Sequence, residues 1–212
     1  MKTALKIIGA SFVALAVLGG AVYAAAEALE TDKTHNDTIS RTVDQVVIKA
    51  ESGDIEVVPG GSSVEIERTD HYVLDSPDET RTLEDGVLTI ESECDSVLAP
   101  FCATDYRVTV PQGVTVDVRT YVGDVDVEGI TGREIEARAY VGDVHVDAAR
   151  KGDVTARTNV GDVDVELPRG TYAVDSDTAV GDSDVDGLIA SDGAQHEVEA
   201  RADVGSVDVT AR

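Results

Sequence analysis

Residues 121–129 read YVGDVDVEG, and the same unit returns as YVGDVHVDA at 140–148, NVGDVDVEL at 159–167, AVGDSDVDG at 179–187 and DVGSVDVTA at 203–211. The glycines of these copies are 19, 19, 20 and 24 residues apart, and a polar insert at 190–194 enlarges the last interval. A repeat of about 20 residues is typical of a solenoid with one coil per repeat. The segment VVIKAESGDIEVV around Gly53 has the same layout, so we count it as an outlying sixth copy.

Within each copy, apolar residues occupy alternate positions. Around Gly142 they run from Ile135 to Val141 and resume at Val144. Such alternation predicts half-buried strands. We therefore expect two short strands per copy that meet at the Gly-Asp pair, where glycine permits a corner. Stacking the copies predicts two inner valine ladders, namely Val122, Val141, Val160, Val180 and Val204, and Val127, Val146, Val165, Val185 and Val209.

The outward positions predict rows of like charge. The acidic row is Asp124, Asp143, Asp162 and Asp182, and the basic row, four residues before the glycines, is Arg119, Arg138, Arg157 and Arg201. Like charges about 4.8 Å apart repel by about 0.9 kcal/mol per pair in water. We expect the basic row to offset this repulsion in part, without a bound ion.

Two tyrosines complete the candidate interaction surface. Tyr121 and Tyr140 occupy equivalent outward positions and are expected to stack, and Tyr172 is a further candidate member. The alternative account of the stacked pair is purely structural, as a cross-strand contact. The surface proposed from the sequence therefore comprises Tyr121, Tyr140, Asp124, Asp143, Asp162, Asp182, Arg119, Arg138 and Arg157.

Charge and motifs exclude several classes of function. The formal net charge is −25, which repels nucleic-acid phosphate and anionic lipid headgroups. The sequence contains no GxSxG, HExxH or glycine-rich phosphate loop. Each coil offers a single Gly-Asp, fewer oxygen ligands than a calcium-binding roll supplies. We expect no catalytic residue, no cofactor, no metal site and no nucleic-acid partner.

The N-terminal segment predicts export. Within residues 1–26, two lysines precede an uncharged stretch of about 20 residues, which is long enough to cross a membrane. The basic start orients the following chain outward. We expect a membrane anchor at 1–26, a polar linker at 27–42 and a β-solenoid domain at 43–212. Cleavage of the first segment by a signal peptidase, giving a secreted protein, is the alternative.

The only two cysteines, Cys94 and Cys102, lie in the part expected to face outward, where disulfides persist. We expect them to be bonded, because a thiolate metal site lacks further cysteines or well-placed histidines. Residues 59–114 depart from the repeat but keep the alternation, which predicts longer hairpin strands on the same sheets, with the cysteine loop between two of them.

Several of these segments together resemble a known family. SGDIEVV near the start, the cysteine-bearing loop, VTVPQGVTVDVRTYVGDVDVEGI, the serial VGDV copies and the hydrophobic start are similar to the toastrack or "putative adhesin" family of bacterial envelope proteins. The likeness spans residues 43–212. It implies an all-β, single-stranded, right-handed β-solenoid on a cell surface, and it brings no catalytic residues.

These observations favour a non-enzymatic, membrane-anchored adhesin or interaction module of the cell surface. A cell-wall polymer or a surface protein is the expected partner. An envelope structural or stress-sensing protein is the alternative, and a glycan-acting β-helix enzyme is a third, because the Asp and Arg rows permit such chemistry.

Overall fold

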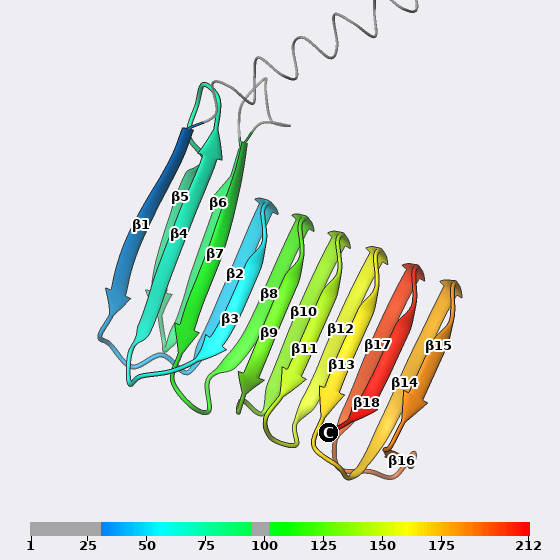
Figure 1. Cartoon of the computed structure of the whole chain (residues 1–212). Helices are drawn as coiled ribbons and strands as arrows, with labels where there is room; N and C mark the ends of the chain where they lie inside the picture. Colours follow the sequence, from blue (N-terminus) through cyan, green and yellow to red (C-terminus); the bar gives the residue numbers. More distant parts are fainter. Residues whose placement is uncertain (1–30, 95–101) are drawn as a thin grey trace, which may run out of the picture.

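The computed structural model describes residues 31–94 and 102–212, and this part of the chain is built from strands and their connections. Two nine-stranded sheets face each other along an elongated body (Figure 1). No helix in the described part is long and apolar enough to cross a membrane. The anchor predicted at 1–26 lies outside the described residues.

The first sheet contains, in spatial order, β1 (Thr31–Ile39), β4 (Val64–Tyr72), β7 (Cys102–Val110), β3 (Ile55–Pro59), β9 (Val125–Ile130), β11 (Val144–Ala148), β13 (Val163–Leu167), β18 (Val207–Ala211) and β15 (Ser183–Asp186). The second contains β16 (Ile189–Ala190), β14 (Thr171–Val180), β17 (Glu197–Val204), β12 (Asp153–Val160), β10 (Glu134–Val141), β8 (Thr115–Val122), β2 (Gln45–Ser52), β6 (Val87–Glu93) and β5 (Asp78–Glu84). The strands of the repeat copies pair in parallel, and antiparallel pairs occur at the β1, β4 and β5 end.

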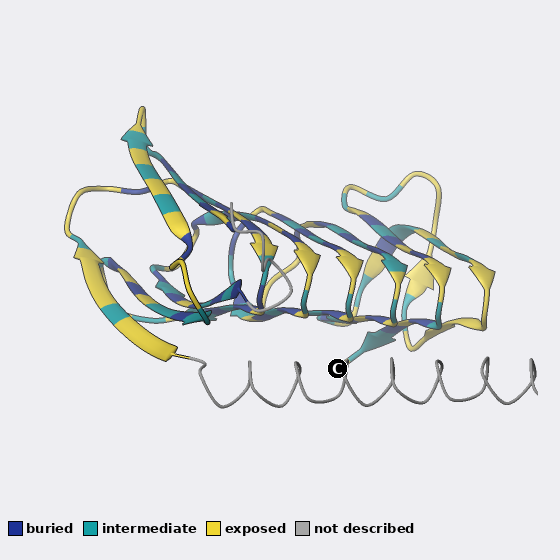
Figure 2. Cartoon of the chain, turned by 90° about the horizontal axis from the view of Figure 1, so that it is seen from above, coloured by how far each residue is buried: buried dark blue, intermediate teal, exposed yellow. Residues whose placement is uncertain are grey.

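Each repeat copy forms one coil, with a strand in each sheet. In the coil β10–β11, Ala137 lies opposite Val118 and Ala156 of the neighbouring coils, and Val146 lies opposite Val127 and Val165. The predicted period of one coil per repeat is therefore confirmed. Figure 2 shows the two sheets as facing layers joined at the corners by exposed chain.

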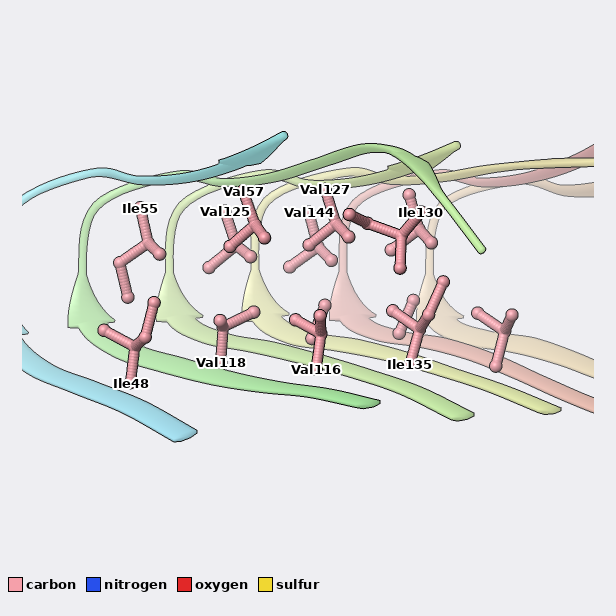
Figure 3. Close-up of a cluster of buried hydrophobic side chains, with 14 of the residues drawn as sticks. Ile48, Ile55, Val57, Val116, Val118, Val125, Val127, Ile130, Ile135 and Val144 are labelled. Atoms are coloured by element: carbon pink, nitrogen blue, oxygen red, sulfur yellow. The ribbon is translucent and has the colours of Figure 1, made fainter. Parts of the chain in front are cut away.

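The hydrophobic core is a thin apolar layer between the sheets (Figure 3). Val116, Val118 and Ile135 of the second sheet face Val125 and Val127 of the first. β-branched side chains suit this space because they pack well on a pleated surface. Few aromatic residues are needed to fill it.

One of the two predicted inner ladders is correct over most of its length, and the other is wrong. Val127, Val146, Val165 and Val209 are fully buried, and only Val185 of that ladder is exposed. The other ladder is 40 to 62% exposed along its whole length, and it consists of Val122, Val141, Val160, Val180 and Val204. The chain begins to turn before each glycine, so the preceding valine points outward. The last side chain that points inward before each corner is the one two residues before this valine, such as Ala139.

The coils do not stack in sequence order. The C-terminal coil β17–β18 lies between β12–β13 and β14–β15, so β14–β15 forms the end of the solenoid. Inner positions explain this order. Ser176 and Ser183 of the end coil align with Ala200 and Val207 of the inserted coil, both fully buried. The β14–β15 coil, which has polar inner side chains, therefore lies at the end of the solenoid, where those side chains meet water.

At the opposite end of the solenoid, part of the linker predicted at 27–42 is a strand. Residues 31–39 form β1, which pairs antiparallel with β4. Its side chains are exposed on both faces except for partial burial of His35 and Ile39. Because both faces of this edge strand are polar, its sequence shows no apolar periodicity, which is why it resembles a linker.

The predicted disulfide between Cys94 and Cys102 is confirmed. Cys94 follows β6 in the second sheet, and Cys102 begins β7 in the first. The bond therefore joins the two sheets at the place where other coils have a Gly-Asp corner. The intervening residues 95–101 lie outside the described part.

Candidate functional site

The corners bring neighbouring coils into close backbone contact. Gly142 has a φ of +142°, and a Cβ added there would lie 2.0 Å from the carbonyl oxygen of Gly123. Only glycine fits this approach without displacing backbone. The close contact places the side chains on either side of each corner in regular rows along the solenoid.

The acidic row is a chain of hydrogen bonds. The Asp124 carboxylate accepts the Asp143 backbone N–H at 2.8 Å, and the Asp143 carboxylate accepts that of Asp162 at 2.7 Å. The same bond recurs from Asp105 through Asp54 to Asp124, and from Asp162 to the N–H of Ser206. These aspartates satisfy corner amides, and this is the structural role that the row performs.

Two members of the acidic row differ from the prediction. Asp182 does not follow Asp162, because Ser206 of the inserted coil lies between them. Asp105 was missed, although TDYRV at 104–108 matches the pattern of GDVDV in the repeat. This copy is hard to recognise in the sequence because Thr104 stands where the other copies have glycine.

The basic row neutralises different carboxylates from those predicted. Arg119 contacts Asp117 at 3.1 Å and Glu136 at 2.7 Å, both on the outer face of the second sheet. Arg138 also pairs with Glu136, and Arg157 pairs with Glu199. The arginines therefore offset the charges of their own sheet face, whereas backbone amides stabilise the Asp row.

Crowding of like charge affects the middle arginine. Partial burial, together with the neighbouring guanidinium groups of Arg119 and Arg157, lowers the pKa of Arg138. The three side chains lie in register on adjacent strands. They form a continuous row of planar hydrogen-bond donors along the sheet.

The predicted tyrosine stack is present. The rings of Tyr121 and Tyr140 lie with centroids 4.6 Å apart and planes 6° from parallel, and both remain about half exposed. Tyr172 does not join them. It is fully buried and donates its hydroxyl hydrogen bond to the Pro168 carbonyl at 2.8 Å.

Exposed valines extend the tyrosine pair into an apolar strip. In the described part, seven of the ten exposed large hydrophobic side chains lie along the corners, so the strip is not a scatter of single residues. We call it the corner surface, and it consists of Tyr121, Val122, Tyr140, Val141, Val160, Val204 and Val180. The arginine row borders it on the sheet, and the aspartate row borders it beyond the corner.

A buried polar network near the other end was not predicted. Asp70 is 1% exposed and pairs with Arg68, which also contacts Glu79 at 3.3 Å. Glu79 accepts the Tyr106 hydroxyl at 3.0 Å, and burial raises the pKa of that hydroxyl. The alternation along β4 could have predicted this network. Val64 and Ile66 point inward, and Arg68 and Asp70 occupy the next positions on the same face of the strand. The charges are paired, which suits a polar end to the core.

His71 links three strands beside this network. Its Nδ1 lies 2.8 Å from Asp32 of β1, and its Nε2 lies 3.1 Å from Asp105 of β7. Burial lowers the pKa of His71, but the two carboxylates together raise it above its ordinary value. When it is protonated, His71 therefore adds ion pairs to the backbone pairing that joins β1 to the sheet.

A polar hollow of about 460 Å³ lies at the ends of β2 and β6, and its lining includes Lys49, Glu51, Glu91 and Ser92. Lys49 and Glu91 form an ion pair of 2.6 Å in it. Among the residues that the structure describes, no group of three His, Cys, Asp or Glu side chains could hold a metal ion.

Two solved structures align with most of this chain. A "putative cell adhesion protein" from Clostridium sporogenes aligns with a TM-score of 0.62 and 13% identity, over 86% of this chain and 100% of that one. A "putative adhesin" from Bacteroides fragilis aligns with a TM-score of 0.42 and 14% identity, over 86% and 97%. No curated protein matches the sequence.

The repeat region identifies the family of this chain. The family model described as Toastrack DUF4097 matches residues 101–210, just over half of the chain. This segment contains five of the six corner glycines, with most of the stacked coils and of the aspartate row. The resemblance seen in the sequence is confirmed, and the chain belongs to the Toastrack DUF4097 family.

Proposed function

We propose that this protein is a non-enzymatic, adhesin-like binding module of a bacterial cell surface, anchored by residues 1–26 with the solenoid outside the membrane. Three observations support this location. The N-terminal segment is basic and then uncharged. The two cysteines form a disulfide, which persists in oxidising surroundings. A solved structure with a similar fold is that of a protein named for cell adhesion.

The corner surface is the observation that carries the binding role. A chain of net charge −25 exposes a continuous row of valines and two stacked tyrosines there. Contiguous exposed apolar residues with a polar rim mark binding sites more often than scattered ones do. Because the strip crosses successive coils, it fits an extended ligand.

The ligand that best fits this surface is an uncharged linear polysaccharide lying along the solenoid. Tyrosines offer an apolar ring with a polar edge, and the arginine row offers planar donors to hydroxyl groups. The arginines are already paired with carboxylates, so they provide hydrogen bonds without excess positive charge. The net charge disfavours polyanions. Coils about 4.8 Å apart present equivalent groups at short, regular intervals.

Calorimetric titration of the full-length chain in detergent tests the proposal. Cellohexaose and chitohexaose are the neutral probes, and polygalacturonate is the anionic one. We expect saturable binding of a neutral probe, weakened at least about tenfold, or about 1.4 kcal/mol, in a Tyr121→Ala/Tyr140→Ala variant. Leu74→Ala is the matched control, because Leu74 is 66% exposed and lies in the connection between β4 and β5, outside the repeat coils.

The outcomes separate the alternatives. Binding of a neutral probe that depends on the tyrosines and not on Leu74 supports the proposal. Binding of polygalacturonate alone, or equal binding by both variants, contradicts it. Absence of binding by every probe would instead favour the structural or stress-sensing role.

A further inference from the structure

The C-terminal coil occupies a slot between two other coils. β17 pairs with β12 on one side and β14 on the other, and β18 pairs with β13 and β15. Val198, Ala200, Val207 and Val209 are fully buried there. In Figure 1 this coil lies between the β12–β13 and β14–β15 coils, although it comes last in the chain. We call the space that it fills the coil slot.

The slot recognises the coil mainly through its backbone. Gly161 donates its N–H to Val204 at 3.0 Å, and Gly205 donates to Val180 at 2.9 Å. The Ser206 N–H bonds to the Asp162 carboxylate at 2.7 Å. These contacts use only features of the repeat itself. The slot therefore accepts the C-terminal coil of another copy by the same contacts as its own.

The connection to the coil is long enough for exchange. Ten residues, 187–196, separate β15 from β17, whereas three residues, 131–133, separate β9 from β10. Ten extended residues span up to about 33 Å. When two copies meet end to end, the partner's slot lies about two coil spacings, or roughly 10 Å, beyond the end coil.

The end coil provides the second observation. Val185 of the end coil is 40% exposed, and β15 has no strand on its outer side within the described part. Copies joined end to end would cover this edge. We propose that two copies of this chain link end to end by reciprocal exchange of residues 197–211 through the coil slot, with each coil making its usual contacts in the other copy.

Charge sets the conditions for this exchange. The end coil carries Asp175, Asp177, Asp184 and Asp186, and these carboxylates would approach those of the second copy. Their repulsion is screened by salt, with a Debye length of about 10 Å at 0.1 M and about 3 Å at 1 M. Exchange should therefore increase with ionic strength.

Cysteine pairs on separate chains test the proposal. Asp164 of β13 and Asp208 of β18 lie directly opposite each other, so cysteines there fall within disulfide range. Full-length Asp164→Cys chains are mixed with Asp208→Cys chains in detergent and partly unfolded with urea. The mixture is then returned to buffer containing 1 M salt and oxidised. We expect a disulfide-linked dimer on a non-reducing gel, because only an exchanged coil brings the two cysteines together.

Matched pairs make the result decisive. Asp126→Cys mixed with His145→Cys reports random collision, since these residues are opposite each other on central coils that do not exchange. At least tenfold more dimer from the exchange pair supports the proposal. Equal amounts overturn it, provided that Asp164→Cys/Asp208→Cys in one chain forms its internal disulfide. A second double variant, Asp164→Cys/Asp184→Cys, places cysteines on β13 and on β15 of the end coil. An internal disulfide in this variant would also overturn the proposal, because the end coil would then occupy the coil slot of its own chain.

Discussion

The corner contacts predict a large effect of a single added carbon at Gly142. The φ of +142° costs an alanine about 1–3 kcal/mol. Its Cβ would meet backbone atoms of Gly123 at 2.0 and 2.6 Å, which cannot rotate away. The two coils must separate, and separation breaks the bonds from Gly123 N–H to Val141 and from Asp143 N–H to Asp124. At about 1 kcal/mol each, the total loss is about 3–5 kcal/mol.

Thermal unfolding of the full-length chain in detergent, followed by circular dichroism, measures this loss. A domain of this size loses about 2–4 °C of Tm per kcal/mol, so Gly142→Ala should lower the Tm by about 6 °C or more. Gly113→Ala is the matched control. Gly113 also has a positive φ, +84°, but an added Cβ there meets nothing within 4 Å.

The comparison separates backbone strain from collision. Gly113→Ala should lose only the conformational part, about 1–2 kcal/mol. Equal losses in the two variants would refute the reasoning, because contact between coils would then contribute nothing. A larger loss at Gly113 would refute it more strongly.

Three further predictions concern other parts of the fold. Asp143→Ala should destabilise the protein by about 1 kcal/mol in urea unfolding, because the Asp162 N–H loses its acceptor, whereas Asp143→Asn keeps an acceptor and should cost less; equal losses would contradict the hydrogen-bond role. Cys94→Ser should lower stability by about 2–3 kcal/mol in the loop-entropy model, and reduction of the wild type should match it; a reduced wild type as stable as the oxidised form would count against this. The raised pKa of His71 means that its stabilising contribution is complete below about pH 6.5 and is lost as the pH rises through the raised pKa. Urea unfolding of the wild type and His71→Gln should therefore converge as the pH increases; a constant difference would contradict this.

The amino-acid sequence was sufficient for the properties that depend on local alternation and repetition. The period of about 20 residues predicted the coils, the Gly-Asp pairs predicted the corners, and the two cysteines predicted the disulfide. Tyr121 and Tyr140 predicted their own stack, since equivalent positions of adjacent coils lie side by side. Each of these inferences requires only the spacing of residues along one chain.

Tertiary structure decided the direction of side chains at the corners and the order of the coils. Val141 continues the alternation in sequence, but the turn before Gly142 points it outward. For this reason the valines of the corner surface were predicted to be core, whereas its two tyrosines were predicted to be outward. The aspartates looked like a repulsive row until backbone amides of the next coil were placed beside them.

The order of the coils depends on competition between whole coils, which alternation along one strand does not describe. Similar repeats can pair with one another in more than one order, because their backbone contacts are alike. The choice between orders rests on which coil loses least by meeting water. Ser176 and Ser183 lose little at the end of the solenoid, whereas Ala200 and Val207 gain by burial inside it, so the last coil of the sequence is not the last coil in space.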